Sequence, residues 1–209
     1  MELGVILSFI GASIILTLMP GPDNLFVLTE SLTKGQKDGI AISLGLSLGV
    51  LIHTLAAATG LSIIIQKSAL AFSIIKYLGA AYLFYLAFKA FKEKKTDLDL
   101  KSTSHIEKTK IFPLVKKGFL MNVLNPKVSL FFIAFLPQFI SPNGYNITLQ
   151  MIILGLIFMS QAFLIFGTIA ILASKLTKYL NNPKFWKITK WSKISVLSIL
   201  GLVLVFSRK

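Results

Sequence analysis

The chain has no cysteine and few charged residues for its length. Without cysteine it has neither a disulfide framework nor a thiolate metal site. Charged residues make up 14% of the 209 positions, whereas a soluble domain carries roughly 25%. Hydrophobic residues make up 55%, and the mean hydropathy is +0.77. This composition excludes an ordinary soluble domain and predicts an all-α membrane protein.

Long uncharged runs indicate where the chain crosses the bilayer. A helix crosses the hydrocarbon layer with about 20 apolar residues. The expected spans are Leu3–Leu28, Gly39–Ile65, Ala69–Phe91, Lys117–Ile140, Ile147–Ser174 and Lys190–Phe206. The last is the weakest, because its apolar run begins only at Ile194, and five spans followed by a surface helix are the alternative. Glu2 stands where a signal peptide would be basic, so we expect the first span to stay in the mature protein.

Basic residues are concentrated in alternate connections between these spans. Seventeen of the 22 lie in the first, third and fifth connections. An excess of lysine and arginine marks cytoplasmic loops. We therefore expect these loops in the cytoplasm, and both termini outside if there are six spans. The same distribution argues against nucleic acid as a partner, although the net charge is +14.

Proline interrupts two of the expected spans in a related way. The segments are Leu16–Val27 and Met121–Phe132, and placing Pro22 over Pro126 puts Asp23 over Lys127. Proline lacks the amide donor that continues a helix, but it suits the first position of a new one. Each break therefore predicts a half-helix N-terminus inside the membrane, with free N–H groups that favour an anion.

Three spans on each side of the central loop give the two halves opposite orientations. We predict six transmembrane helices arranged as two inverted three-helix repeats, with proline-broken helices 1 and 4. The first repeat covers residues 1–91, a basic cytoplasmic linker covers 92–116, and the second repeat covers 117–209, all within one membrane domain. Transporters with inverted repeats bind their solute where the repeats meet.

The candidate binding residues surround the two breaks. They are Pro20, Gly21, Pro22, Asp23, Asn24, Asn125, Pro126 and Lys127. A charge near the bilayer centre costs about 2.5–3.5 kcal/mol, and pairing Asp23 with Lys127 would lower that cost. An amine that competes for Asp23 and a carboxylate that competes for Lys127 describe a small zwitterionic solute. The structural alternative is two kinked helices whose freed carbonyls bond to neighbouring helices.

Two further polar residues lie in apolar spans. His53 continues a row of small residues and either bonds to a neighbour or serves the site as a proton relay. Gln161 is a weaker candidate for the same roles. Residues 45–49 match the G-x-S-x-G motif of serine hydrolases, but Ser47 and His53 point to different sides of one helix, so we expect no enzyme. We expect no metal and no cofactor.

Three stretches together resemble the LysE/RhtB family of bacterial amino-acid exporters. They are Pro20–Asn24, Lys76–Leu83 and Gly118–Lys127 continuing to Leu136–Phe139. The resemblance implies a secondary exporter of small amino acids in the bacterial inner membrane, driven by protons. The Asn125–Lys127 sequence is similar to the RhtB-like branch, which implies neutral or hydroxylated substrates such as threonine, homoserine or leucine.

Transport of an inorganic or metal ion is the main alternative function. Such a site would need several converging carboxylates or histidines, and the expected spans offer Asp23 and His53. The exact substrate, the coupling ion and the oligomeric state stay open, a homo-oligomer included.

Overall fold

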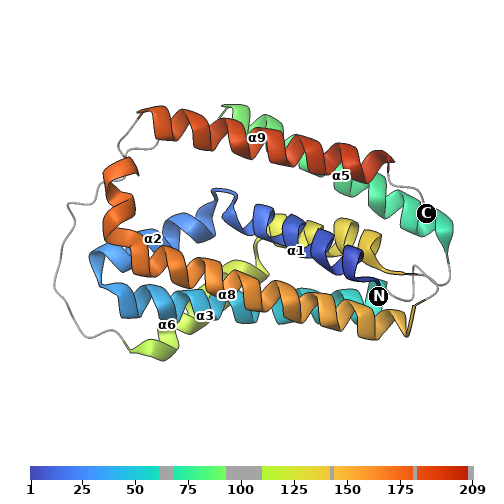
Figure 1. The fold of residues 1–209 in the computed structure, drawn as a ribbon, viewed down its shortest axis with the longest axis horizontal. Coiled ribbons are helices and arrows are strands. Elements are labelled where there is room, and N and C mark those ends of the chain that lie inside the picture. The colour runs from blue at the N-terminus through green and yellow to red at the C-terminus, as the bar shows by residue number, and fades with distance from the viewer. Residues whose placement is uncertain (62–67, 93–109, 142–143, 181–182, 207–209) are drawn as a thin grey trace.

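The computed structural model describes residues 1–61, 68–92, 110–141, 144–180 and 183–206, and its regular elements are helices (Figure 1). In the first half, α1 (Leu3–Leu18) and α2 (Pro22–Thr33) meet at an angle of 59°. α3 (Gln36–Ala56) follows Gly35, whose positive φ of 105° suits glycine, and continues into the π-helical turn η1 (Ala57–Leu61). α5 (Ala69–Lys92) completes this half.

The second half begins with another broken helix. α6 (Ile111–Val123) is followed by α7 (Pro126–Leu130), the π-helical η2 (Phe131–Phe135) and the 3-10 turn η3 (Leu136–Phe139). The bend at this break is 50°. The long helices α8 (Ile147–Leu180) and α9 (Pro183–Phe206) follow. Helix α6 thus starts inside the segment expected to be a linker.

The prediction of an all-α membrane protein is confirmed, and both broken helices are present. Among the residues that the structure describes, three helices are long and apolar enough to cross a membrane, and up to five spans result if each bent pair counts as one. The expected sixth span lies in α9, which is not among these candidates. The count of six therefore stays a prediction.

Corresponding helices of the two halves run in opposite directions. In Figure 1, α1, α5 and α8 run from right to left, whereas α3, α6 and α9 run from left to right. Helix α3 packs against α6 and α8, α5 packs against α9, and α8 also packs against α1 and α2. The start of α1 and the end of α9 lie at the same end of the bundle (Figure 1). The arrangement as two inverted repeats stays a prediction.

Glycines bring α3 and α6 into close contact. A Cβ on Gly118 would collide with the carbonyl oxygen of Ile42, and one on Gly45 would collide with that of Val115. A Cβ on Gly49 would come within 2.7 Å of Asn122 Cβ. Small residues allow helix backbones in a membrane to approach this closely. The contact fixes α6, and therefore the second break, against the middle of α3.

Candidate functional site

The two proline breaks lie against each other in the interior of the bundle. A cavity between them is lined by Leu16, Thr17, Asp23, Asn122, Lys127, Val128, Phe158 and Phe166. Its volume of about 10 Å³ is the room of roughly one water molecule. The structure therefore brings Asp23 and Lys127, one from each half, to a single small cavity.

Asn125 links the two halves through its side chain. Its Nδ2 donates to Asp23 Oδ2 at 2.7 Å, and both side chains are buried. Its Oδ1 accepts from the backbone N–H of Lys127 at 3.0 Å, which caps the start of α7. Asparagine is a preferred N-cap because its oxygen replaces a missing helical acceptor. One amide group therefore both begins α7 and holds the carboxylate of Asp23.

The sequence had suggested that Lys127 pairs with Asp23, but the two side chains do not pair directly. The Lys127 ammonium donates to the carbonyl oxygens of Leu16, in the last turn of α1, at 3.1 Å and of Met19, the residue that follows α1, at 3.3 Å. Within the described residues, the ion pair found is Lys34 with Glu30. Pro20 stands four residues after Leu16 and has no N–H, so the Leu16 carbonyl lacks its helical donor. Lys127 supplies that donor from the other half.

His53 has the corresponding role at the second break. Pro126 stands four residues after Asn122 and leaves the Asn122 carbonyl without its helical donor. His53 Nε2 lies 3.1 Å from this oxygen, which also accepts from the N–H of Asn125 at 2.9 Å. A carbonyl only accepts, so the bond places a proton on Nε2. The structural role weighed for His53 is therefore present, and its role as a relay stays a prediction.

Gln161 and Asn24 meet at Thr17. Gln161 Nε2 donates to Thr17 Oγ1 at 2.9 Å, and Asn24 Nδ2 donates to the Thr17 carbonyl at 3.0 Å. In the described residues, the amide oxygens of Asn24, Asn122 and Gln161 are buried without a hydrogen-bond partner. Buried polar atoms normally have partners. The site therefore has more acceptors than its own donors satisfy, which suits a positively charged ligand group.

The two half-helix N-termini differ, although both were expected to offer free amides. At α7, Asn125 Oδ1 takes the amide of Lys127, and the Asn125 carbonyl accepts the next two, from Val128 and Ser129. At α2 the N-cap is Gly21, which has no side chain to cap the helix. The expectation is thus wrong for α7, because asparagine caps it, and α2 alone keeps an uncapped start.

Two residues of the site were missed by the sequence interpretation, Thr17 and Asn122. Thr17 receives bonds from both halves, and Asn122 lines the cavity and accepts from His53. The position of Asn122, four residues before Pro126, was the available signal. Ser47, by contrast, donates to the Ser43 carbonyl in its own helix. The structure thus does not bring Ser47 and His53 together.

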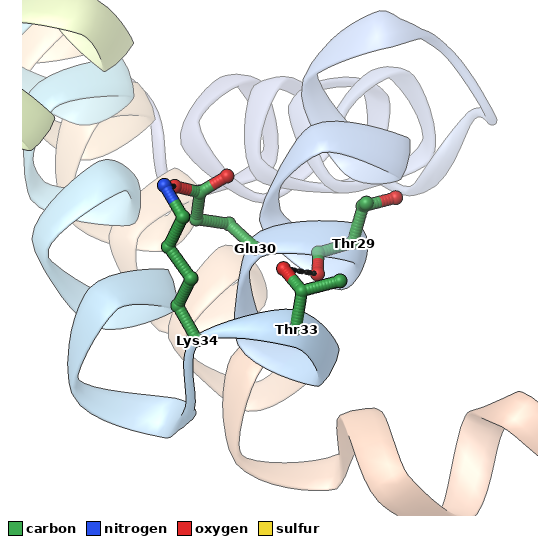
Figure 2. Close-up of polar contacts among 4 residues, drawn as sticks. All are labelled: Thr29, Glu30, Thr33 and Lys34. Carbon is green, nitrogen blue, oxygen red and sulfur yellow. Dashed lines mark hydrogen bonds and ion pairs between the residues drawn. The ribbon is translucent and has the colours of Figure 1, made fainter. Parts of the chain in front are cut away.

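An ion pair lies at the C-terminal end of α2, away from the residues of the cavity. Glu30 Oε1 lies 2.8 Å from Lys34 Nζ, and Thr33 Oγ1 donates to the Thr29 carbonyl at 2.9 Å (Figure 2). The hydrogen bond to Glu30 raises the pKa of Lys34 above its usual value. Glu30 is buried, whereas 47% of the Lys34 side chain is exposed. The pair anchors the end of the broken helix rather than the site.

These features define the chain as a multi-pass membrane protein in which two broken helices from opposite halves share buried polar groups. Its residues 14–208 match the family described as LysE type translocator. The chain belongs to this family. Among the described residues, no group of three or more His, Cys, Asp or Glu side chains is placed to hold a metal ion.

Several curated proteins are similar over nearly their whole length. An uncharacterized membrane protein of Bacillus subtilis, YrhP, is 35% identical over 94% of this chain and 95% of its own. The homoserine/homoserine lactone efflux protein of Salmonella typhimurium is 28% identical over 96% of each chain. The leucine efflux protein of Klebsiella pneumoniae is 28% identical over 98% of this chain and 93% of its own. No solved structure matches.

Proposed function

We propose that this protein is a secondary transporter that exports a small amino acid, or a close derivative of one, from the cytoplasm. Family membership and two relatives named as efflux proteins support the class. The observation that carries the proposal is the contact between the breaks, where Asn125 of one half holds Asp23 of the other at 2.7 Å. A solute bound there touches both halves, so its binding is coupled to their relative movement.

The polar groups match the two ends of a zwitterion. Asp23, the carbonyls at the end of α1 and the unpartnered amide oxygens accept hydrogen bonds from an ammonium group. The uncapped start of α2 and the Lys127 ammonium attract a carboxylate. Lys127 also repels a cationic side chain, which favours neutral or hydroxylated substrates such as threonine, homoserine or leucine.

The cavity of about 10 Å³ is far smaller than an amino acid, so the structure represents a closed conformation. Transport requires the two halves to separate on one side and then on the other. Helix α3 packs closely against both α6 and α8. We assign the coupling of transport to protons, with His53 and Gln161 as the candidate residues of a proton relay or of the binding site.

The proposed topology has six spans in the bacterial inner membrane, with the basic connections in the cytoplasm and both termini outside. A C-terminal fusion to a protein that fluoresces only in the cytoplasm is expected to stay dark. A bright fusion with wild-type expression would instead indicate five spans, with α9 on the cytoplasmic surface.

Transport itself is tested with purified protein in proteoliposomes loaded with single amino acids. Counterflow of a labelled neutral amino acid is expected for the wild type and for Lys116→Ala, an exposed lysine in α6. Asp23→Asn and Lys127→Ala are expected to lose more than about 90% of the initial rate, because each removes one half of the ligand's charge pairing.

Three outcomes contradict different parts of the proposal. Absence of counterflow for every amino acid tested, with a folded wild-type protein, removes amino-acid export. Wild-type rates in both Asp23→Asn and Lys127→Ala would refute the assignment of the binding site but not the proposed export function. A proton gradient that fails to accelerate export removes the coupling assignment alone.

A further inference from the structure

We infer that the end of α1 is an ammonium-binding site, which the Lys127 side chain occupies in this conformation and yields to the ammonium group of the substrate. The inference deepens the proposed function and rests on it where the substrate is concerned. The site itself stands on contacts in the structure and is tested separately.

Proline creates the acceptors of this site. Pro20 and Pro22 have no N–H. Pro20 stands four residues after Leu16, and Pro22 stands four residues after Leu18 and three after Met19. The chain also bends by 59° here, so later amides point elsewhere. The carbonyls of Leu16 and Met19 are thus left at the end of a half-helix, where the helix dipole is negative and favours a cation.

The Lys127 ammonium satisfies these carbonyls from across the interface. It donates to Leu16 O at 3.1 Å and Met19 O at 3.3 Å, and its Nζ lies 3.7 Å from the position of a Cβ on Gly21. The lysine tip therefore lies in van der Waals range of the Gly21 backbone. Asp23 lines the same cavity.

An amino-acid ammonium has the same chemistry as the tip of lysine. Both are tetrahedral groups with three N–H donors and one positive charge. The carbonyls of Leu16 and Met19 cannot distinguish them by charge or donor number. The cavity holds about one water molecule, so the two groups cannot occupy it together. Binding of substrate therefore requires Lys127 to leave.

Exchange of the two groups links binding to the opposite half. Lys127 belongs to the short helix α7, and its backbone amide is fixed by Asn125. When the substrate ammonium takes the α1 carbonyls, the lysine tip is free to meet the substrate carboxylate. In the empty carrier the lysine returns to α1, so the carbonyls never lack a donor in the closed state. Lys127 thus donates to the α1 carbonyls during the return step, when no substrate ammonium is bound.

The test uses purified protein in detergent and two small cations of the same charge. Methylammonium donates hydrogen bonds, whereas tetramethylammonium cannot. Lys127→Ala is expected to melt about 5–10 °C below the wild type, because two buried carbonyls lose their donor. Methylammonium is expected to recover at least half of this loss, and tetramethylammonium none. The wild type and Lys116→Ala should respond to neither cation.

A double-mutant cycle gives a second measurement that needs no added cation. Pro20→Ala restores an amide four residues after Leu16, so the Leu16 carbonyl no longer depends on Lys127. The drop in Tm caused by Lys127→Ala should be at least twofold smaller in the Pro20→Ala background. If Lys127→Ala alone does not fold, the double variant should be recovered from membranes in greater yield than the single one.

The results separate the site from the function. Equal responses of Lys127→Ala to both cations, together with additive effects of Pro20→Ala and Lys127→Ala, overturn the ammonium site. Recovery by methylammonium without any amino-acid counterflow in the wild type supports the site and removes the proposed substrate. Recovery of Lys127→Ala by methylammonium but not by tetramethylammonium, together with amino-acid counterflow by the wild type, supports both.

Discussion

Replacement of Asn125 is expected to destabilise the protein at two points at once. In Asn125→Ala, α7 loses its N-cap, which costs about 1 kcal/mol. Asp23 Oδ2 also loses the donor that lies 2.7 Å away, and a buried acceptor left unpaired costs about 1–3 kcal/mol. The sum is about 2–4 kcal/mol, which corresponds to a fall in Tm on the order of 5–15 °C for a chain of this size.

Asn146 provides a matched control for the cap alone. Its Oδ1 accepts from the N–H of Leu149 at 3.2 Å at the start of α8, and the residue is exposed. Asn146→Ala therefore removes a cap without stranding a buried carboxylate. We expect a loss of about 0.5–1 kcal/mol. Thermal unfolding of both variants in the same detergent, followed by circular dichroism, gives the comparison.

Exchange of the two side chains sharpens the test. Asn125→Asp keeps an oxygen to cap α7 but places a second carboxylate against Asp23, and we expect it to be at least as damaging as Asn125→Ala. Combining it with Asp23→Asn recreates one carboxylate and one amide at the same contact. The swapped protein should melt within about 3 °C of the wild type. Equal losses in Asn125→Ala and Asn146→Ala, or a swapped protein no better than Asn125→Asp, would refute this reasoning.

Three other measurements follow from the contacts already described. Gly118→Ala should lose about 1–3 kcal/mol through overpacking against Ile42, whereas Gly11→Ala, with open space around its Cβ position, should lose nothing in the same thermal assay. His53→Gln should retain most of the stability lost in His53→Ala, because glutamine still offers a donor to the Asn122 carbonyl; equal losses would contradict the bond. The Lys34–Glu30 pair, exposed on its lysine side, should contribute below about 1 kcal/mol. Since the pKa of Lys34 is raised in the folded state, this contribution should be complete below its unfolded pKa of about 10.4 and vanish as the pH rises through the folded value, a change that Lys34→Met should abolish.

The sequence predicted the breaks well because proline acts locally. A missing N–H at residues 20, 22 and 126 interrupts a helix whatever surrounds it, and bends of 59° and 50° stand at these places. The apolar runs likewise predicted where α5 and α8 begin, because burial in lipid depends on composition over a long window. Helix ends were less predictable, since α8 and α9 both extend into lysine-rich segments beyond the expected spans.

Partners across the interface were beyond the sequence interpretation. Opposite charges at aligned positions suggested that Asp23 would bind Lys127, but Asp23 binds Asn125 and Lys127 binds carbonyls of α1. Side-chain charges are visible in a sequence, whereas backbone acceptors are the same at every position. A carbonyl that needs a donor from elsewhere is found by looking four residues before each proline, where the helical N–H is missing. For Pro20 and Pro126 this points to Leu16 and Asn122.

At each break, a side chain from the other half bonds to the carbonyl that proline leaves without a donor, and this has a consequence for synthesis. The Leu16 carbonyl bonds to Lys127, and 111 residues separate them. In lipid an unpaired backbone group costs several kcal/mol, so the first three helices, once inserted, carry an uncompensated defect until α7 arrives. The N-terminal half is therefore not an independent folding unit. The first half reaches its final structure only after the second half has inserted. A chain truncated before residue 125 should therefore be degraded by membrane proteases rather than accumulate as a smaller stable protein.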